Sequence, residues 1–149
     1  MSDNFLRIIP TVPTFVPAAA AQAVALAQLR SAFPGADEVG ASVEPTVVFV
    51  DAGANVESVA CPRCANELAE AWWLAAMDRA AVGGFVDLAV ELPCCGGPVS
   101  LADLHYAWPQ GFARFVIEIR NPGRALAADQ LAHLGAILGC DLRVIRAHV

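Results

Sequence analysis

In RFVIEIR, from Arg114 to Arg120, apolar residues stand at every second position, and three of the four positions between and beside them are charged. A period of two is typical of a strand that turns one face toward a core and the other toward solvent. We expect three side chains to point inward: Phe115, Ile117 and Ile119. The same alternation runs through FVDLAVEL, from Phe85 to Leu92, and predicts a second half-buried strand of the antiparallel kind.

Three further strands are predicted on either side of these two. FLRII, at 5–9, is a strand that stops at Pro10, and DLRVIRAHV, at 141–149, closes the chain. TVVFV, at 46–50, is apolar on both faces, which predicts a central strand covered on both sides.

Three helices are predicted from apolar spacing and from glycine terminators. The first runs over about 18–33 and ends at the Pro-Gly pair at 34–35. The second follows Cys64 at once and ends at two glycines, at 83–84. The third is marked by Leu131, Leu134 and Leu138, and it ends at Gly139.

These elements predict a single α+β domain over 1–149, with a mixed or antiparallel sheet, about three helices and a zinc-knuckle-like insertion. The two ends of the chain share a loose plan of strand, proline turn, helix and glycine. That succession is generic and does not by itself establish a duplication.

Charge narrows the range of partners. The net charge is −6, all nine basic residues are arginines, and no polybasic run occurs, so we expect neither nucleic acid nor an anionic membrane as a partner. The first residues lack the basic and apolar regions of a signal peptide, and the alanine-rich stretch after Pro17 is interrupted by glutamines. We therefore expect a cytoplasmic protein.

Four of the five cysteines form two pairs, and these pairs are the strongest chemical signal. CPRC holds Cys61 and Cys64, and PCCGG holds Cys94 and Cys95. A C-x-x-C turn brings two sulfurs to one side of the chain, and glycines let the second loop bend around an ion. We expect a structural zinc site with four cysteine ligands in metal loops near 61–64 and 94–97.

Two alternatives remain open for these cysteines. Adjacent residues of a strand point opposite ways, so one of Cys94 and Cys95 could ligate while His105 supplies the fourth ligand. Without a metal, CPRC before a helix would favour thiol redox chemistry. The fifth cysteine, Cys140, is interpreted as an apolar filler.

Two other groups of residues have both a functional and a structural interpretation. Tyr106 and Trp108 lie in HYAWPQGF, a segment with proline and glycine, and either they bind a partner or they cover the core. Asp87 and Glu91 share a strand face, where cross-strand pairing with arginine is the simpler interpretation.

The combination of CPRC, a Trp-Trp pair, PCCGG and SLADLHYAWPQGFARF resembles a group of short uncharacterised bacterial proteins over nearly the whole chain. That resemblance implies no known activity. CPRC alone is similar to zinc-ribbon knuckles, which implies a structural metal.

The preferred functional prediction is a cytosolic zinc-containing protein that acts by binding a protein partner, without catalysis. A toxin-neutralising immunity protein is one version, since such proteins are small and acidic. The alternatives are a zinc-dependent enzyme with an open site near His105 and a thiol redox protein.

Overall fold

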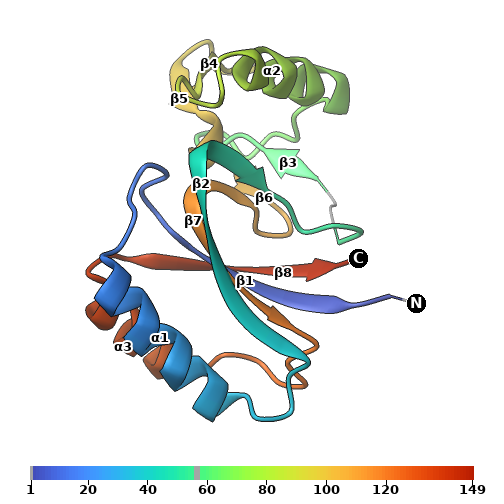
Figure 1. The fold of residues 1–149 in the computed structure, drawn as a ribbon. Helices are drawn as coiled ribbons and strands as arrows, with labels where there is room; N and C mark the ends of the chain where they lie inside the picture. The colour runs from blue at the N-terminus through green and yellow to red at the C-terminus, as the bar shows by residue number, and fades with distance from the viewer. Residues whose placement is uncertain (1, 56–57) are drawn as a thin grey trace.

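A computed structural model describes residues 2–55 and 58–149 and contains a main sheet of four antiparallel strands (Figure 1). The strands are β1 (Asn4–Pro10), β2 (Glu38–Val50), β7 (Gly111–Arg120) and β8 (Leu142–His148), in the order β2-β7-β1-β8. RFVIEIR therefore lies in an inner strand, hydrogen-bonded to a neighbour on each side. The predicted α+β class, with three helices and antiparallel sheets, is confirmed.

Each end of the chain folds as one strand-helix-strand unit. Helix α1 (Ala19–Ala32) joins β1 to β2, and helix α3 (Ala128–Leu138) joins β7 to β8. The first strands of the two units are paired in the middle of the sheet, and each unit's second strand pairs with the other unit's first. This is the split β-α-β plan of ferredoxin-like folds. The similarity between the two ends of the sequence thus corresponds to the same strand-helix-strand topology at each end.

Both helices of the repeat cover one face of the sheet (Figure 1). Phe115, Ile117 and Ile119 point toward them and are fully buried, as the alternation predicted. Leu29 of α1 and Leu134 of α3 meet these strand residues in one cluster. The helix-side cluster as a whole consists of Leu6, Ile8, Ala25, Leu29, Phe33, Phe115, Ile117, Ile119, Leu134 and Leu138.

The prediction of a central strand at 46–50 was wrong, because β2 is an edge strand that begins already at Glu38. Its apolar end is nonetheless covered on both faces. Val47 packs in one core cluster and Val50 in another on the opposite side. The pairing with β7 shifts between Val43 and Val48, around Pro45, and an edge strand tolerates such a proline.

The chain between β2 and β7 forms a separate layer above the end of the sheet, and we call residues 59–106 the metal lobe (Figure 1). Its elements are β3 (Val59–Ala60), α2 (Glu70–Val82), β4 (Ala89–Glu91), β5 (Pro98–Ser100), the 3-10 turn η1 (Leu101–Asp103) and β6 (His105–Tyr106). Phe112 of β7 lies 5.3 Å from Phe49 of β2 and 5.4 Å from Phe85 of the lobe, measured between ring centroids. These rings join the lobe to the sheet.

The strand predicted over 85–92 is only partly formed, since β4 covers just three of its residues. Phe85 has a φ of 56°, outside the extended region, so the strand cannot begin there. Val86, which the alternation predicted to point inward, is 82% exposed. Leu88, Val90 and Leu92 do pack in the core of the lobe.

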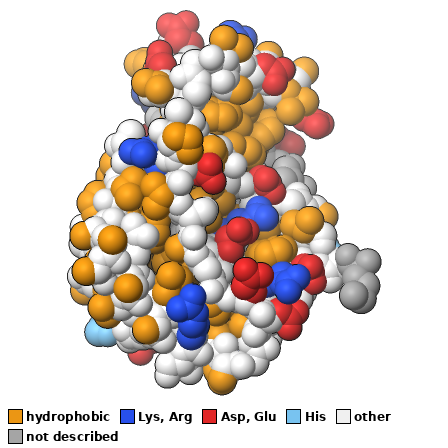
Figure 2. Space-filling model, viewed as in Figure 1, with side chains coloured by type: hydrophobic (Ala, Val, Ile, Leu, Met, Phe, Trp, Pro, Cys, Tyr) orange, Lys and Arg blue, Asp and Glu red, His pale blue; other side chains and the backbone are white. Residues whose placement is uncertain are grey.

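The sheet face opposite the helices carries charged residues. Arg7 donates from Nε to Glu118 at 2.9 Å and from Nη1 to Asp51 at 3.3 Å. Figure 2 shows acidic and basic side chains gathered on the right of the lower half of the molecule, in the view of Figure 1. Among the described residues, none of the helices combines the length and apolar character needed to span a bilayer.

Candidate metal centre

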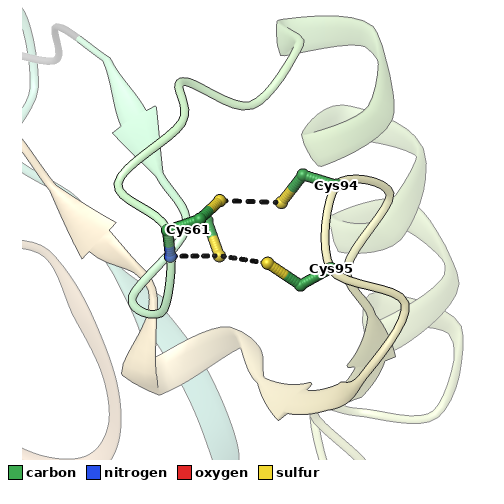
Figure 3. A group of neighbouring side chains, drawn as sticks. Cys61, Cys94 and Cys95 are labelled. Atoms are coloured by element: carbon green, nitrogen blue, oxygen red, sulfur yellow. Dashed lines mark hydrogen bonds between the residues drawn. The ribbon is translucent and has the colours of Figure 1, made fainter.

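Four cysteine sulfurs from two loops of the metal lobe converge on one point. Cys61 and Cys64 come from the loop after β3, and Cys94 and Cys95 from the turn between β4 and β5. All four ligand atoms lie within 4.8 Å of one another. Figure 3 shows the sulfurs of Cys94 and Cys95 pointing across toward the loop that carries Cys61. The four cysteines lie close enough to hold one metal ion.

The spacing of the sulfurs fits a tetrahedral ion. Sγ of Cys61 lies 3.8 Å from Sγ of Cys95, and Sγ of Cys64 lies 3.5 Å from Sγ of Cys94. Zinc bound to four thiolates at about 2.3 Å would place the sulfurs about 3.8 Å apart. The four thiolates would carry a charge of about −4, and a divalent ion would reduce it to about −2.

The two loops have the same backbone turn. In the first, the N–H of Ala65 donates to the carbonyl of Cys61 at 3.0 Å, and the N–H of Cys61 donates to the carbonyl of Asn66 at 2.8 Å. In the second, the N–H of Gly96 donates to Leu92 at 2.8 Å, and that of Leu92 donates to Gly97 at 3.0 Å. CPRCAN and LPCCGG therefore superpose residue for residue as two knuckles.

This correspondence explains how two adjacent cysteines can face one ion. Leu92 occupies the place of Cys61 and is buried, Cys95 that of Cys64, and Cys94 that of Arg63. Because the backbone turns here, Cys94 and Cys95 do not alternate as they would in a strand. Leu92 was not among the predicted site residues, although an alignment of the two Pro-containing segments places it opposite Cys61.

The two knuckles differ at the residue that has positive φ. Ala65 has a φ of 62° and Gly96 a φ of 67°, at equivalent positions. A side chain is unfavourable in this left-handed region, and glycine is not. The first knuckle is therefore strained where the second is relaxed.

We expect Ala65→Gly to stabilise the protein and Gly96→Ala to destabilise it, each by about 1 kcal/mol. No atom lies within 4 Å of a Cβ added at Gly96, so backbone strain is the only cost. Urea unfolding of both zinc-loaded variants measures the two changes. Effects of the same sign would contradict the assignment of equivalent turns.

Hydrogen bonds from the backbone favour a thiolate at Cys61. Burial raises the pKa of this thiol, but the N–H groups of Cys64 and Arg63 donate to its sulfur and lower the pKa to about 6. The hydrogen bond with Cys64, followed by burial, raises the pKa of Cys95 to about 12. Burial and hydrogen bonds with Cys64 and Cys61 raise the pKa of Cys94. Without a metal, Cys94 and Cys95 therefore stay protonated at neutral pH.

Zinc binding at pH 7.5 is accordingly expected to release at least two protons, those of Cys94 and Cys95, because a ligating sulfur must be a thiolate. Since protons compete with the metal, affinity rises with pH. Calorimetric titration in two buffers with different ionisation enthalpies measures the release. A value near zero would exclude these two sulfurs as ligands.

The start of helix α2 and the position of His105 bear on the alternatives to a four-cysteine site. Helix α2 does not follow Cys64 at once but begins at Glu70, because the knuckle turn occupies the residues between them. The C-x-x-C pair therefore does not cap a helix, and the thiol redox alternative stays a prediction. His105 is exposed in β6 and is not a member of the four-sulfur group.

Arg63 connects the two knuckles. Its Nη2 donates to the carbonyl of Pro98 at 2.7 Å. A Cβ on Gly97 would lie 1.7 Å from Nη1 of Arg63, so this glycine leaves room for the guanidinium.

The aromatic segment is half-buried. Tyr106 Oη donates to the carbonyl of Leu101 at 2.7 Å, and burial raises its pKa to about 12. Trp108 Nε1 donates to the carbonyl of Arg146 at 2.6 Å, and its side chain packs against the core cluster that contains Ile145. Both polar tips are thus engaged within the protein, and a partner-binding role for Tyr106 and Trp108 stays a prediction.

Trp108→Ala is expected to cost about 1–3 kcal/mol of stability, because it removes a packed ring and leaves the carbonyl of Arg146 without this donor. Thermal unfolding measures the change. A variant as stable as the native protein would show that the ring contributes nothing to the fold and would support its use in binding.

No protein-family model matches the chain, and neither a curated protein nor a solved structure matches it.

Proposed function

We propose that the protein is a zinc-containing binding protein, in which a structural Zn²⁺ holds the metal lobe in shape for a protein partner. The observation that carries the proposal is the closed set of four sulfurs within 4.8 Å of one another. Four thiolates saturate tetrahedral zinc, whereas a catalytic zinc keeps a position for water. The arrangement therefore favours a structural role over an enzyme with an open site near His105.

Four thiolates in a tetrahedral arrangement are typical of structural zinc and also of iron centres. We propose zinc, and elemental analysis of protein purified without added metal distinguishes the two metals.

Exposed apolar residues of the lobe support a partner surface. Val82 at the end of α2 is 91% exposed and Val86 is 82% exposed. Val86 also borders a hollow of about 590 Å³ lined by α2 and β4, which contains Arg79, Asp87 and Glu91. These two exposed valines are apolar surface that a protein partner could cover. A toxin-neutralising immunity protein remains one version of this proposal, supported by size and charge.

The test is site-specific photo-crosslinking in cells of the source organism. A photoreactive residue is placed at Val86, which lies in the lobe, or at Ala107, which follows it directly. Val24 on α1 is the control position. We expect one discrete adduct from a lobe position, absent at Val24 and lost when Cys64→Ser removes the metal. Equal labelling at all three positions, or labelling unaffected by metal loss, would contradict a zinc-dependent partner surface.

A further inference from the structure

The two loops that would hold the metal place two exposed sulfurs, one from each loop, close together. Cys64 and Cys94 are both exposed, and their sulfurs lie 3.5 Å apart. Cys95 is exposed as well, but its sulfur lies 3.8 Å from that of Cys61, which is fully buried. Of these two sulfur pairs that join the loops, Cys64 and Cys94 are therefore the closer one and the one in which both sulfurs are open to an oxidant from solvent.

We propose that Cys64 and Cys94 form a site of reversible thiol oxidation, where a peroxide converts the zinc-bound pair into a disulfide and releases the ion. This inference rests on the proposed zinc centre. In the reaction the two thiolate sulfurs lose two electrons and form an S–S bond. The O–O bond of hydrogen peroxide breaks, and two protons from solvent complete two molecules of water. Zinc leaves as Zn²⁺.

Release follows from the loss of ligands. Structural zinc requires four ligands, and after oxidation only the thiolates of Cys61 and Cys95 remain in the set. Zinc itself is redox-inactive, so the electrons come from the sulfurs alone.

The oxidation is reversible because the two cysteines of the disulfide lie in different loops. Cys64 belongs to the first knuckle and Cys94 to the second, so their disulfide joins the same two loops that the metal joins. The lobe keeps a covalent connection while the ion is absent. Reduction by a dithiol then restores two thiolates on loops that are still close together.

The fifth cysteine provides an internal control. Cys140 is partly buried, lies at the end of α3 in the helix-side part of the fold, and is not a member of the four-sulfur group. The sequence has five cysteines, and Cys140 is the one outside the metal loops. Cys140→Ser therefore leaves the metal loops intact and removes the one other thiol that could take part in disulfide exchange.

The experiment uses the zinc-loaded Cys140→Ser protein and adds hydrogen peroxide in steps. A chromogenic chelator follows zinc, and peptide mapping under non-reducing conditions identifies the disulfides. We expect about one ion released per peroxide consumed, with Cys64–Cys94 as the first disulfide, and rebinding of zinc after dithiothreitol and zinc are added.

Two results would overturn the proposal: retention of zinc when peroxide is consumed, or a first disulfide other than Cys64–Cys94. Zinc content measured before oxidation distinguishes an error in the oxidation proposal from an error in the proposed zinc centre. A protein that binds no zinc refutes the centre, whereas one that binds zinc and keeps it under peroxide refutes only the oxidation site.

Discussion

Cys64→Ser is expected to abolish metal binding and to unfold the metal lobe while the four-stranded sheet persists. Cys64 is exposed, so its replacement removes a ligand without disturbing the packing around the buried Cys61. Structural zinc contributes apparent binding free energies of about 10–16 kcal/mol in small zinc domains, and most of that stabilisation depends on a complete ligand set. Zinc content should fall from about one ion per chain to near zero.

The sheet should survive because its helix-side cluster contains no residue of the lobe. Hydrogen exchange is expected to become fast in α2 and in the two knuckles, and to stay slow in β1 and β7. Cys140→Ser is the matched control and should keep both zinc and protection. Equal loss of zinc from the two variants would show that the ligands are misassigned.

Phe112→Ala is expected to have the largest effect of any single packing change on the attachment of the lobe. Phe112 is 2% exposed and its ring lies between Phe49 and Phe85. Truncation of a buried phenylalanine costs about 3–5 kcal/mol. The loss should appear first in the lobe, since the cluster around Phe112 contains Leu68, Met77 and Leu101.

Phe115→Ala is the matched comparison, because Phe115 is equally buried in the same strand but faces the helices. Both variants should bind one zinc, since the knuckles are closed by local hydrogen bonds. Urea unfolding measures the total loss and hydrogen exchange its location. A loss under about 1 kcal/mol for Phe112→Ala, or one located at α1 and α3, would contradict this account of the attachment.

The strands and helices that follow a single periodicity could be predicted from the sequence. RFVIEIR alternates because its two faces meet different environments, and α3 ends at Gly139, whose φ is 79°. The alternation and the terminal glycine depend only on residues that are close together in the sequence. The edge position of β2 could not be predicted in this way, because its apolar end is covered by residues of the lobe that are distant in sequence.

The same distinction applies to the metal centre. The pairing of C-x-x-C with a second cysteine pair indicated four ligands, and the structure brings those four together. The helix start was misplaced by five residues because apolar spacing cannot register a turn that precedes the helix. The turn of the second knuckle depends on hydrogen bonds between Leu92, Gly96 and Gly97, which are visible only once both loops are compared.

Zinc-edge X-ray absorption of protein purified without added metal tests whether four cysteine sulfurs bind one zinc ion. We predict about one zinc per chain, with four sulfur neighbours at about 2.3 Å and no nitrogen or oxygen neighbour. Three sulfurs with one nitrogen or oxygen would contradict the closed site and point to an open or histidine-containing one. Folded protein with no bound metal would contradict the centre altogether.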